Sequence, residues 1–472
     1  MTKPLNKFII ITISIFLVSC ITPKINIREA NKKIPSLYYL ASSDSINVSK
    51  INWKFFFEDE YLNQLIDSAL INNQELNIFL QDIEISKNEV REKKGEYMPK
   101  VGLDADLSNS KISENTRDGS LDKILDKNNL NAPNGELGLG ANLAWEVDIW
   151  KRLRNAKNAA EMRLMATKEG KNLLVTRLIA EIANTYYELL ALDNTIKILN
   201  ENILIQEEAY NKMKVLKDYA KANQLAVNRF EAQLLNTKNQ KFNINQQIIE
   251  TENRLKFLTG KIAAKVNRDS DKMLVMNINS IQTGVPIQLL QNRPDIRQAE
   301  FVIKSSQLDL KVAKANLYPK LDISAGLGFR AFDPSLLIKP QSLIYNAAGG
   351  LMAPLINRNA VIARMNVANA VQIQASLNYE QILLQSYTEV LNQMAKIDNT
   401  NKSYEMKKNE VKILNESVDV ANSLFQYAKA DYIEVLLTQK EHLNAEMELI
   451  ETKLNLIGSK VDLYRALGGG WQ

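Results

Sequence analysis

The sequence predicts a mostly helical chain that also carries four membrane-length β-strands, arranged as two similar halves. Three observations support this prediction. Short sequences recur in the same order in both halves, two very long stretches contain neither Gly nor Pro, and four short segments alternate apolar with polar side chains. The chain has 472 residues, of which 45% are hydrophobic and 24% charged, so it can bury a sizeable core.

The composition excludes several classes of protein. Lys and Arg number 59 against 54 Asp and Glu, and this balance gives no reason to expect a nucleic-acid partner. One Cys and one His exclude a Cys/His zinc site, a disulfide within the chain and a Cys-ligated iron–sulfur cluster. No nucleophile–base pair or metal-ligand cluster is visible in the sequence. We therefore expect no enzyme, no catalytic residue, no metal site and no cofactor other than a covalent lipid.

The amino terminus predicts a lipoprotein signal. Lys3 and Lys7 precede the apolar run Phe8–Val18, which is too short to span a bilayer. The run leads into Leu-Val-Ser-Cys, which resembles a bacterial lipobox and contains Cys20, the only cysteine. The resemblance implies that residues 1–19 are removed and that Cys20 carries S-diacylglycerol and an N-acyl chain, enough for stable anchoring in lipid. The alternative is a free thiol in an ordinary signal segment.

An internal repeat organises the rest of the chain. The sequence around Pro99-Lys100 is repeated around Pro319-Lys320, and the tetrapeptide Tyr-Ala-Lys-Ala occurs at both 219–222 and 427–430. We expect a lipid-anchored segment, a first repeat, a linker and a second repeat, with boundaries at 20–58, 59–260, 261–285 and 286–472.

Each half begins alike. A helix is expected at 75–98 and at 295–318, and each ends at a Pro because the residue before Pro avoids the α region. Apolar side chains then recur at every second position, which indicates strands with one apolar face. The expected strands lie at about 100–112, 136–148, 320–331 and 342–355.

The Gly- and Pro-free stretches, 171–259 and 357–457, predict long helices. Unbroken, the longer one would reach about 150 Å, so we expect each stretch to fold back at its Tyr-Ala-Lys-Ala sequence, with tips at about 217–224 and 425–432. A coiled-coil seam is expected along the last helix, and His442 is expected on its exposed, charged face. The seam residues are Leu443, Met447, Ile450, Leu454, Ile457, Val461 and Tyr464.

Ten residues is about the length of a transmembrane strand. Four strands leave two open edges, and lipid offers no partner for their backbone groups. If the strands span a membrane, the chain must therefore oligomerise. Two copies would give a narrow barrel filled by side chains, and three would give 12 strands around a lumen. The alternative is a soluble β-sandwich whose apolar face packs inward.

Four motifs together resemble the TolC-like outer-membrane efflux channels, in particular the NodT/OprM-like lipoprotein branch that serves resistance–nodulation–division (RND) pumps. The motifs are WEVDIWKRLR at 145–154, RPDIRQAE at 293–300, APLINR at 353–358 and YRALGGGW at 464–471.

This resemblance implies a TolC-like α/β barrel. A homotrimer would form a 12-stranded barrel in the outer membrane, and long antiparallel helical hairpins would form a tunnel through the periplasm. The chain would be a passive conduit without catalysis, working with a periplasmic membrane-fusion adaptor and an inner-membrane RND pump. The competing hypothesis is a lipid-anchored coiled-coil structural or interaction protein without a pore. The sequence does not predict the exported substrate.

The same resemblance implies that the periplasmic tips close the pore. Ile433 falls at the family's apolar constriction position, whereas the family's acidic ring falls on Leu437. Asp431 or Glu434 would then supply the acidic groups, one register away. The alternative is that both are solvated charges at a helix end. The expected adaptor contacts at the tips are Tyr219, Ala220, Lys221, Tyr427, Ala428 and Lys429.

Overall fold

The computed structural model describes residues 27–38, 48–127, 135–262, 265–276, 283–353 and 358–471. The expected lipid site, Cys20, and the residues 354–357 of one motif lie outside this part of the chain. The chain forms two compact units, and each combines segments of both sequence repeats. One unit consists of Met1–Ala30, Glu84–Met165 and Glu300–Asn378, and the other of Asn31–Ile83, Ala166–Ala299 and Tyr379–Gln472.

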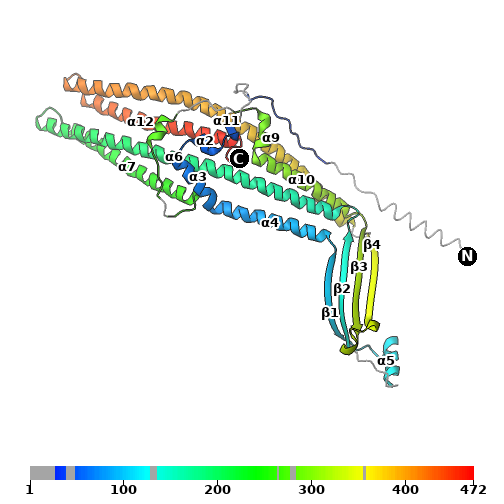
Figure 1. The fold of residues 1–472 in the computed structure, drawn as a ribbon. Coiled ribbons are helices and arrows are strands. Elements are labelled where there is room, and N and C mark those ends of the chain that lie inside the picture. Colours follow the sequence, from blue (N-terminus) through cyan, green and yellow to red (C-terminus); the bar gives the residue numbers. More distant parts are fainter. Residues whose placement is uncertain are drawn as a thin grey trace. The chain divides into compact units, whose positions relative to one another are not determined.

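The described strands of the first unit form an antiparallel sheet with the order β1-β2-β3-β4 (Figure 1). Each strand pairs with its neighbour in sequence, including β2 and β3, which come from different repeats. The outer sides of β1 and β4 have no strand partner within the described residues. The strands are β1 (Lys100–Asn109), β2 (Gly135–Val147), β3 (Lys320–Ala331) and β4 (Leu343–Met352).

Two of the strands are shorter than the expected ranges. β1 ends at Asn109 because that residue pairs with Gly135, the first residue of β2. β4 ends at Met352, which pairs with Lys320 at the beginning of β3. The register of the partner strand therefore limits the ladder, and no single-strand pattern contains that information.

Helices flank the strands in sequence. α4 (Gln74–Tyr97) leads into β1, and α10 (Pro294–Ala315) leads into β3. α5 (Arg117–Lys127) lies in the connection between β1 and β2. The shorter helices are α2 (Trp53–Phe57), α3 (Glu60–Asn72), α8 (Asp271–Val275) and α9 (Leu289–Asn292), and the single 3₁₀ turns are Val48–Lys50, Pro286–Gln288, Pro334–Leu336 and Pro340–Ser342.

The WEVDIWKRLR motif forms the junction between β2 and α6. The Asp148 carboxylate accepts hydrogen bonds from the amides of Leu153 and Arg154, at 3.0 and 2.9 Å, and so caps the beginning of the helix. The Trp150 indole stacks on Tyr318 with ring centroids 4.7 Å apart. The motif therefore turns a strand into a helix and also ties the two repeats together.

Two helical hairpins account for most of the second unit (Figure 1). The first is made of α6 (Arg152–Asp218) and α7 (Gln224–Leu258), and the second of α11 (Arg358–Gln426) and α12 (Tyr432–Ala466). Five of the seven expected seam positions in α12 are buried, and Met447 and Leu454 are partly buried. None of the described helices is long and apolar enough to cross a membrane.

Both hairpins turn through an Ala in the left-handed region. Ala220 and Ala428 each have a φ of 55°. The Lys221 amide donates to the Leu216 carbonyl at 2.8 Å, and the Ala220 amide donates to the Lys217 carbonyl at 2.9 Å. This is the Schellman pattern, which normally places Gly in the left-handed position. An L-residue in that position is strained, because its Cβ approaches the backbone carbonyl.

The RPDIRQAE and YRALGGGW motifs meet in the second unit. The nearly buried Arg293 guanidinium contacts Asp295, donates to Glu389 at 2.8 Å, and donates to the Ala466 carbonyl at 2.7 Å. Burial alone would lower the pKa of Arg293, but hydrogen bonds and charges from the two carboxylates outweigh it and raise that pKa. The cation therefore holds the beginning of α10 against α11 and the end of α12.

In the segment expected as a linker, 261–285, two of the described residues bond to the helices. Arg268 bonds to Asp193 and to Glu252, at 2.5 and 2.6 Å. The Lys453 ammonium donates to the Met276 carbonyl at 2.9 Å, and burial lowers the pKa of this lysine. These bonds fix the segment against α6, α7 and α12.

We expect Ala428→Gly, and likewise Ala220→Gly, to stabilise the hairpin turn by about 0.5–1 kcal/mol, because Gly relieves the left-handed strain at a smaller cost in unfolded-state entropy. Hydrogen exchange at the Lys429 amide, which donates to the Leu424 carbonyl at 2.8 Å, should slow accordingly. Ala430→Gly is the matched control, since its φ is not positive. Equal effects of the 428 and 430 substitutions would contradict the strain argument.

Candidate functional site

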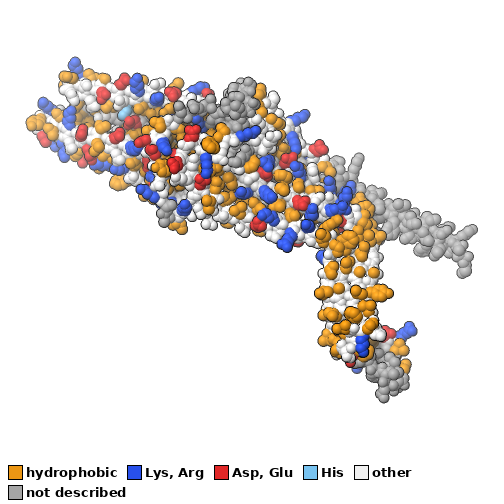
Figure 2. All heavy atoms as spheres, viewed as in Figure 1, with side chains coloured by type: hydrophobic (Ala, Val, Ile, Leu, Met, Phe, Trp, Pro, Cys, Tyr) orange, Lys and Arg blue, Asp and Glu red, His pale blue; other side chains and the backbone are white. Residues whose placement is uncertain are grey.

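The sheet exposes a continuous apolar face. Alternate side chains of each strand point to opposite faces, and paired residues share a face. One face carries Leu103 and Tyr345, whose side chains are 87% and 82% exposed, with Leu327 between them on β3. Hydrophobic side chains cover much of the strands in Figure 2, and charged ones are sparse there. No segment among the described residues covers this face, which contradicts the alternative of a sandwich packed inward.

The opposite face is polar. Asn142 lies beside Asp104 and donates to its carboxylate at 3.0 Å. Arg330 approaches Asp106 at 3.5 Å and Glu136 at 3.8 Å. These residues come from three different strands, and the strand register brings them onto one surface. The sheet can therefore present a hydrated, charged surface on one side and an apolar surface on the other.

Several positions on the polar face are Gly, and polar side chains of neighbouring strands lie against their backbone. A Cβ on Gly326 would lie 2.6 Å from the Asn346 amide oxygen, so the polar side chain lies across the bare backbone of its neighbour. At Gly328 a Cβ would lie 2.7 Å from the Leu139 carbonyl oxygen and 2.8 Å from the Gly140 Cα. Backbone atoms cannot rotate away, so the close approach of β2 and β3 at this point requires Gly.

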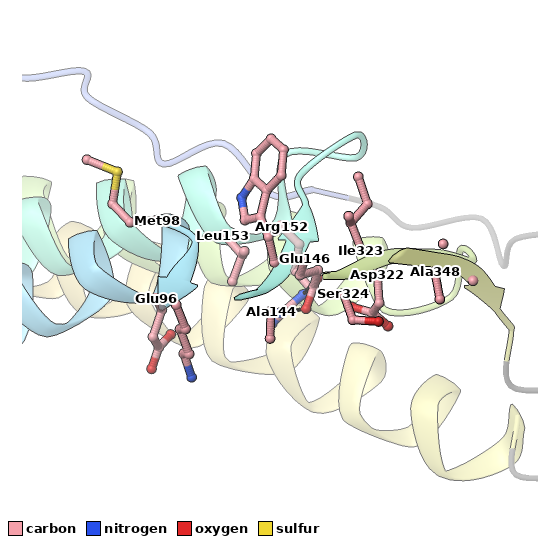
Figure 3. A pocket seen from close by; sticks show the side chains of 14 residues that line it. Glu96, Met98, Ala144, Glu146, Arg152, Leu153, Asp322, Ile323, Ser324 and Ala348 are labelled. Carbon is pink, nitrogen blue, oxygen red and sulfur yellow. Dashed lines mark hydrogen bonds and ion pairs between the residues drawn. The ribbon is translucent and has the colours of Figure 1, made fainter. Parts of the chain in front are cut away.

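A groove of about 650 Å³ lies where the polar face meets the helices (Figure 3). Its side chains come from the end of α4, from β2, β3 and β4, and from the first turn of α6. Glu146 accepts two hydrogen bonds from Arg152, at 2.8 and 2.6 Å, while Asp322 on β3 is exposed. The groove extends the polar face of the sheet to its helical end.

At the hairpin tips, the expected adaptor-contact residues are exposed. This holds for Tyr219, Ala220, Lys221, Tyr427, Ala428 and Lys429. Asp431 and Glu434 are also exposed, and Asp431 occupies the N-cap position of α12 without making a side-chain capping bond. Ile433 is partly buried in the first turn of α12.

An apolar cluster joins the two tips, and its members were not predicted from the sequence. Met213 on α6 and Phe230 on α7 are buried in it, and Phe425, Tyr432 and Leu436 of the second hairpin pack against it. Ile433 is not a member of the cluster. The two hairpins therefore contact each other near their tips through apolar side chains on either side of the second turn.

The expectation that His442 is exposed is wrong. Its side chain is 16% exposed, and its Nδ1 lies 3.7 Å from the Glu446 carboxylate. Burial raises the pKa of Glu446, against the opposing effect of His442. Asn202 on α6 donates to the same carboxylate at 3.3 Å, so a polar pair sits between α6 and α12. Within the described residues, no three His, Cys, Asp or Glu side chains are placed to hold a metal ion.

The sequence matches the family model described as outer membrane efflux protein twice, over residues 65–261 and 285–469. The chain belongs to the outer membrane efflux protein family. The two matches also agree with the internal repeat. Membership makes the chain an outer-membrane efflux channel with a helical periplasmic part, as the sequence predicts, and does not favour the pore-free rod.

Individual relatives cover almost the whole chain. The cation efflux system protein CusC of Escherichia coli O6:H1 is 23% identical over 93% of each chain. The solvent efflux pump outer membrane protein SrpC of Pseudomonas putida is 26% identical, over 89% of this chain and 87% of its own length. The structure of the outer-membrane channel OprN matches with a TM-score of 0.83 and 23% identity, over 96% of this chain and 99% of that one. This confirms the predicted protomer fold of helical hairpins with a four-stranded sheet.

We expect Gly328→Ala to destabilise the sheet by about 1–3 kcal/mol, because the added methyl group meets backbone atoms of β2. Gly350→Ala is the matched control, since it shares the polar face and has no atom within 4 Å of an added Cβ. Unfolding by urea in detergent can be followed by tryptophan fluorescence. The urea concentration at the unfolding midpoint should fall for Gly328→Ala and stay unchanged for Gly350→Ala. Indistinguishable midpoints would show that β2 and β3 can move apart without cost.

Proposed function

We propose that this chain forms a passive homotrimeric conduit, the outer-membrane component of a tripartite efflux pump. The observation that carries the proposal is a four-stranded sheet with an exposed apolar face, a polar face and two outer edges that no described strand pairs with. In a barrel wall, the first face would meet lipid and the second would line the lumen. The chain would supply a path and no catalysis, as in the channel family to which it belongs.

The unpaired edges support a trimer. β1 and β4 each have ten residues, so the outer edge of β4 in one copy can pair with that of β1 in the next. Backbone groups in lipid need such partners, because no water is present to replace them. Two copies would give eight strands, whose interior side chains fill, whereas three copies would give 12 strands and leave a lumen for the polar face.

The partners follow from the same architecture. We propose that the exposed tips meet a periplasmic membrane-fusion adaptor and that an inner-membrane RND pump supplies energy and selects the cargo. The relatives named above are called cation and solvent efflux proteins, which agrees with a conduit whose cargo is set elsewhere. Transport by the chain would then require no substrate pocket of its own.

Native mass spectrometry of the full chain in detergent should show three copies. Three copies are expected because trimer formation pairs the strand edges. Replacing Ala347 on β4 with Pro, which lacks the amide hydrogen, should therefore reduce the fraction of trimer. The control is Ala347→Val, which changes the same side chain but keeps the amide hydrogen. A stable monomer in the parent would contradict the conduit.

We further propose that Cys20 carries the lipid anchor. The Arg28 backbone is bound beside Gln372 on α11, 14 residues after that helix begins at Arg358, or about 21 Å at 1.5 Å per residue. The eight residues from Cys20 to Arg28 can reach at most about 29 Å. A lipid on Cys20 can therefore reach the end of α11 that follows the strands.

Growth with a labelled fatty acid should label the parent protein and leave Cys20→Ser unlabelled. No other cysteine is present to accept the diacylglycerol, so the loss should be complete. Equal labelling of both proteins would exclude Cys20 as the attachment site. Ser19→Ala, which keeps a small residue before the cysteine, serves as the control and should remain labelled.

For the gate, we propose that Ile433, with Asp431 or Glu434, narrows the periplasmic mouth. Ile433 lies in the first turn after the left-handed tip, and it is outside the apolar cluster that Tyr432 and Leu436 join. It is therefore free to face a threefold axis while its neighbours hold the two hairpins together. Three apolar side chains around a narrow axis exclude water, and nearby carboxylates favour cations.

Ile433→Gly should raise the resting conductance in planar bilayers, because the apolar constriction is removed. The double substitution Asp431→Asn with Glu434→Gln should weaken cation selectivity, measured as the reversal potential in a salt gradient. Asn444→Ala, at an exposed position further along the same helix, is the control. If the Ile433 variant and the double variant both conduct like the parent, the constriction lies elsewhere.

A further inference from the structure

The amino-terminal arm is held by a buried polar pair on α11. Gln372 and Ser376 are both 0% exposed, although each is polar and both lie on a helix with many exposed positions. A buried amide is costly unless its donors and acceptor are bonded. Here the partner is the main chain of Arg28, which is far away in sequence.

The Gln372 side-chain amide bonds to the arm as the backbone of a neighbouring β-strand would, with one donor and one acceptor. The Gln372 Nε2 donates to the Arg28 carbonyl at 2.7 Å, and the Gln372 Oε1 accepts from the Arg28 amide at 3.2 Å. The second Nε2 hydrogen reaches the Ser376 Oγ at 3.0 Å, and that hydroxyl lies 3.1 Å from the same Arg28 carbonyl. The bonds engage only the backbone of Arg28, so the pair recognises an extended chain rather than a particular side chain.

Contacts further along the arm follow α11 in the same direction. The Asn31 amide donates to Glu380 at 2.9 Å, and the Lys32 ammonium lies 5.8 Å from the centre of the Tyr379 ring. Tyr38 stacks on Tyr387 with ring centroids 5.7 Å apart. Each of these contacts engages one group of an arm residue, whereas the Gln372–Ser376 pair bonds both backbone groups of Arg28.

We propose that Gln372 and Ser376 form a main-chain clamp that holds the amino-terminal arm on α11 and sets how far the lipid anchor can lie from that helix. The second part rests on the lipidation of Cys20 proposed above. The clamp lies about 21 Å along α11, and the eight residues before Arg28 span at most about 29 Å. The reach of the tether exceeds the distance along the helix by no more than about 8 Å, so the clamp limits how far this part of α11 can lie from the bilayer.

Trypsin cleavage of the full-length protein in lipid nanodiscs, which leave the periplasmic side accessible, tests the clamp. Cleavage after Arg28 gives a new amino terminus at Glu29, which mass spectrometry can follow over time. Gln372→Ala should accelerate this cleavage about tenfold, since cleavage requires the arm to leave the helix and the open population sets the rate. Ser376→Ala should accelerate it less, because the Gln372 bonds remain. Gln374→Ala, at an exposed position two residues away, should stay within about twofold of the parent.

Cleavage after the exposed Lys429 at a hairpin tip provides an internal reference. Acceleration at Arg28 alone supports the clamp. Equal acceleration at both sites would show that Gln372 supports the whole fold, and equal rates for the 372 and 374 variants would show that it holds nothing. Either result overturns the proposal.

The length of the tether is tested by deleting residues 23–26, which leaves four residues and a reach of about 14 Å. In the lipidated protein the deletion should pull the arm away and raise Arg28 cleavage to the Gln372→Ala rate. With residues 1–20 replaced by a cleavable, non-lipid signal, the same deletion should have no effect. If the protein is labelled by the fatty acid but the deletion does not change cleavage at Arg28, the proposed limit on the distance to the bilayer is overturned and the clamp is not. Absence of fatty-acid labelling instead overturns the lipid anchor and leaves the trypsin result standing.

Discussion

The unpaired outer edges of β1 and β4 are the constraint on which the rest of the molecule depends. Each strand of the sheet pairs with its neighbour in sequence, but these two outer edges have no strand partner among the described residues. Such edges are aggregation-prone in water and unacceptable in lipid. In the proposed trimer, copies of the chain would pair these edges, which are equal in length and lie beside one apolar face. The helices would then have to fit a ring, which would limit where each hairpin can go.

The junctions between strands and helices transmit that constraint. Asp148 begins α6 directly after β2, so the register of the sheet determines where a helix of 67 residues starts. Arg293 ties α10 to α11 and α12 at the other end of the repeat. A shift in the register of β2 would therefore move the beginning of α6. The hydrogen bonds of Asp148 oppose such a shift in the first unit, and those of Arg293 hold helix ends in the second. Neither hairpin is positioned by its own sequence alone.

The sequence could predict periodic features and could not predict pairings. Alternation identified the strands, and the repeated tetrapeptide located both turns, because these signals are local. The register between β2 and β3 depends on a close approach at Gly140 and Gly328, which are far apart in sequence. The burial of His442 could not be predicted because it depends on another helix: Asn202 on α6 donates to Glu446, which lies beside His442 on α12. The apolar contacts around Phe425 and Tyr432 were missed for the same reason, since a helix-end aromatic residue carries no signal of its partner.

The left-handed alanines give the two hairpins the same turn. Both hairpins reverse through Tyr-Ala-Lys-Ala with the same φ of 55° at the first Ala. An L-residue is strained in this region, so each tip stores a similar amount of strain. A partner that meets both tips would therefore meet the same backbone shape twice in each copy.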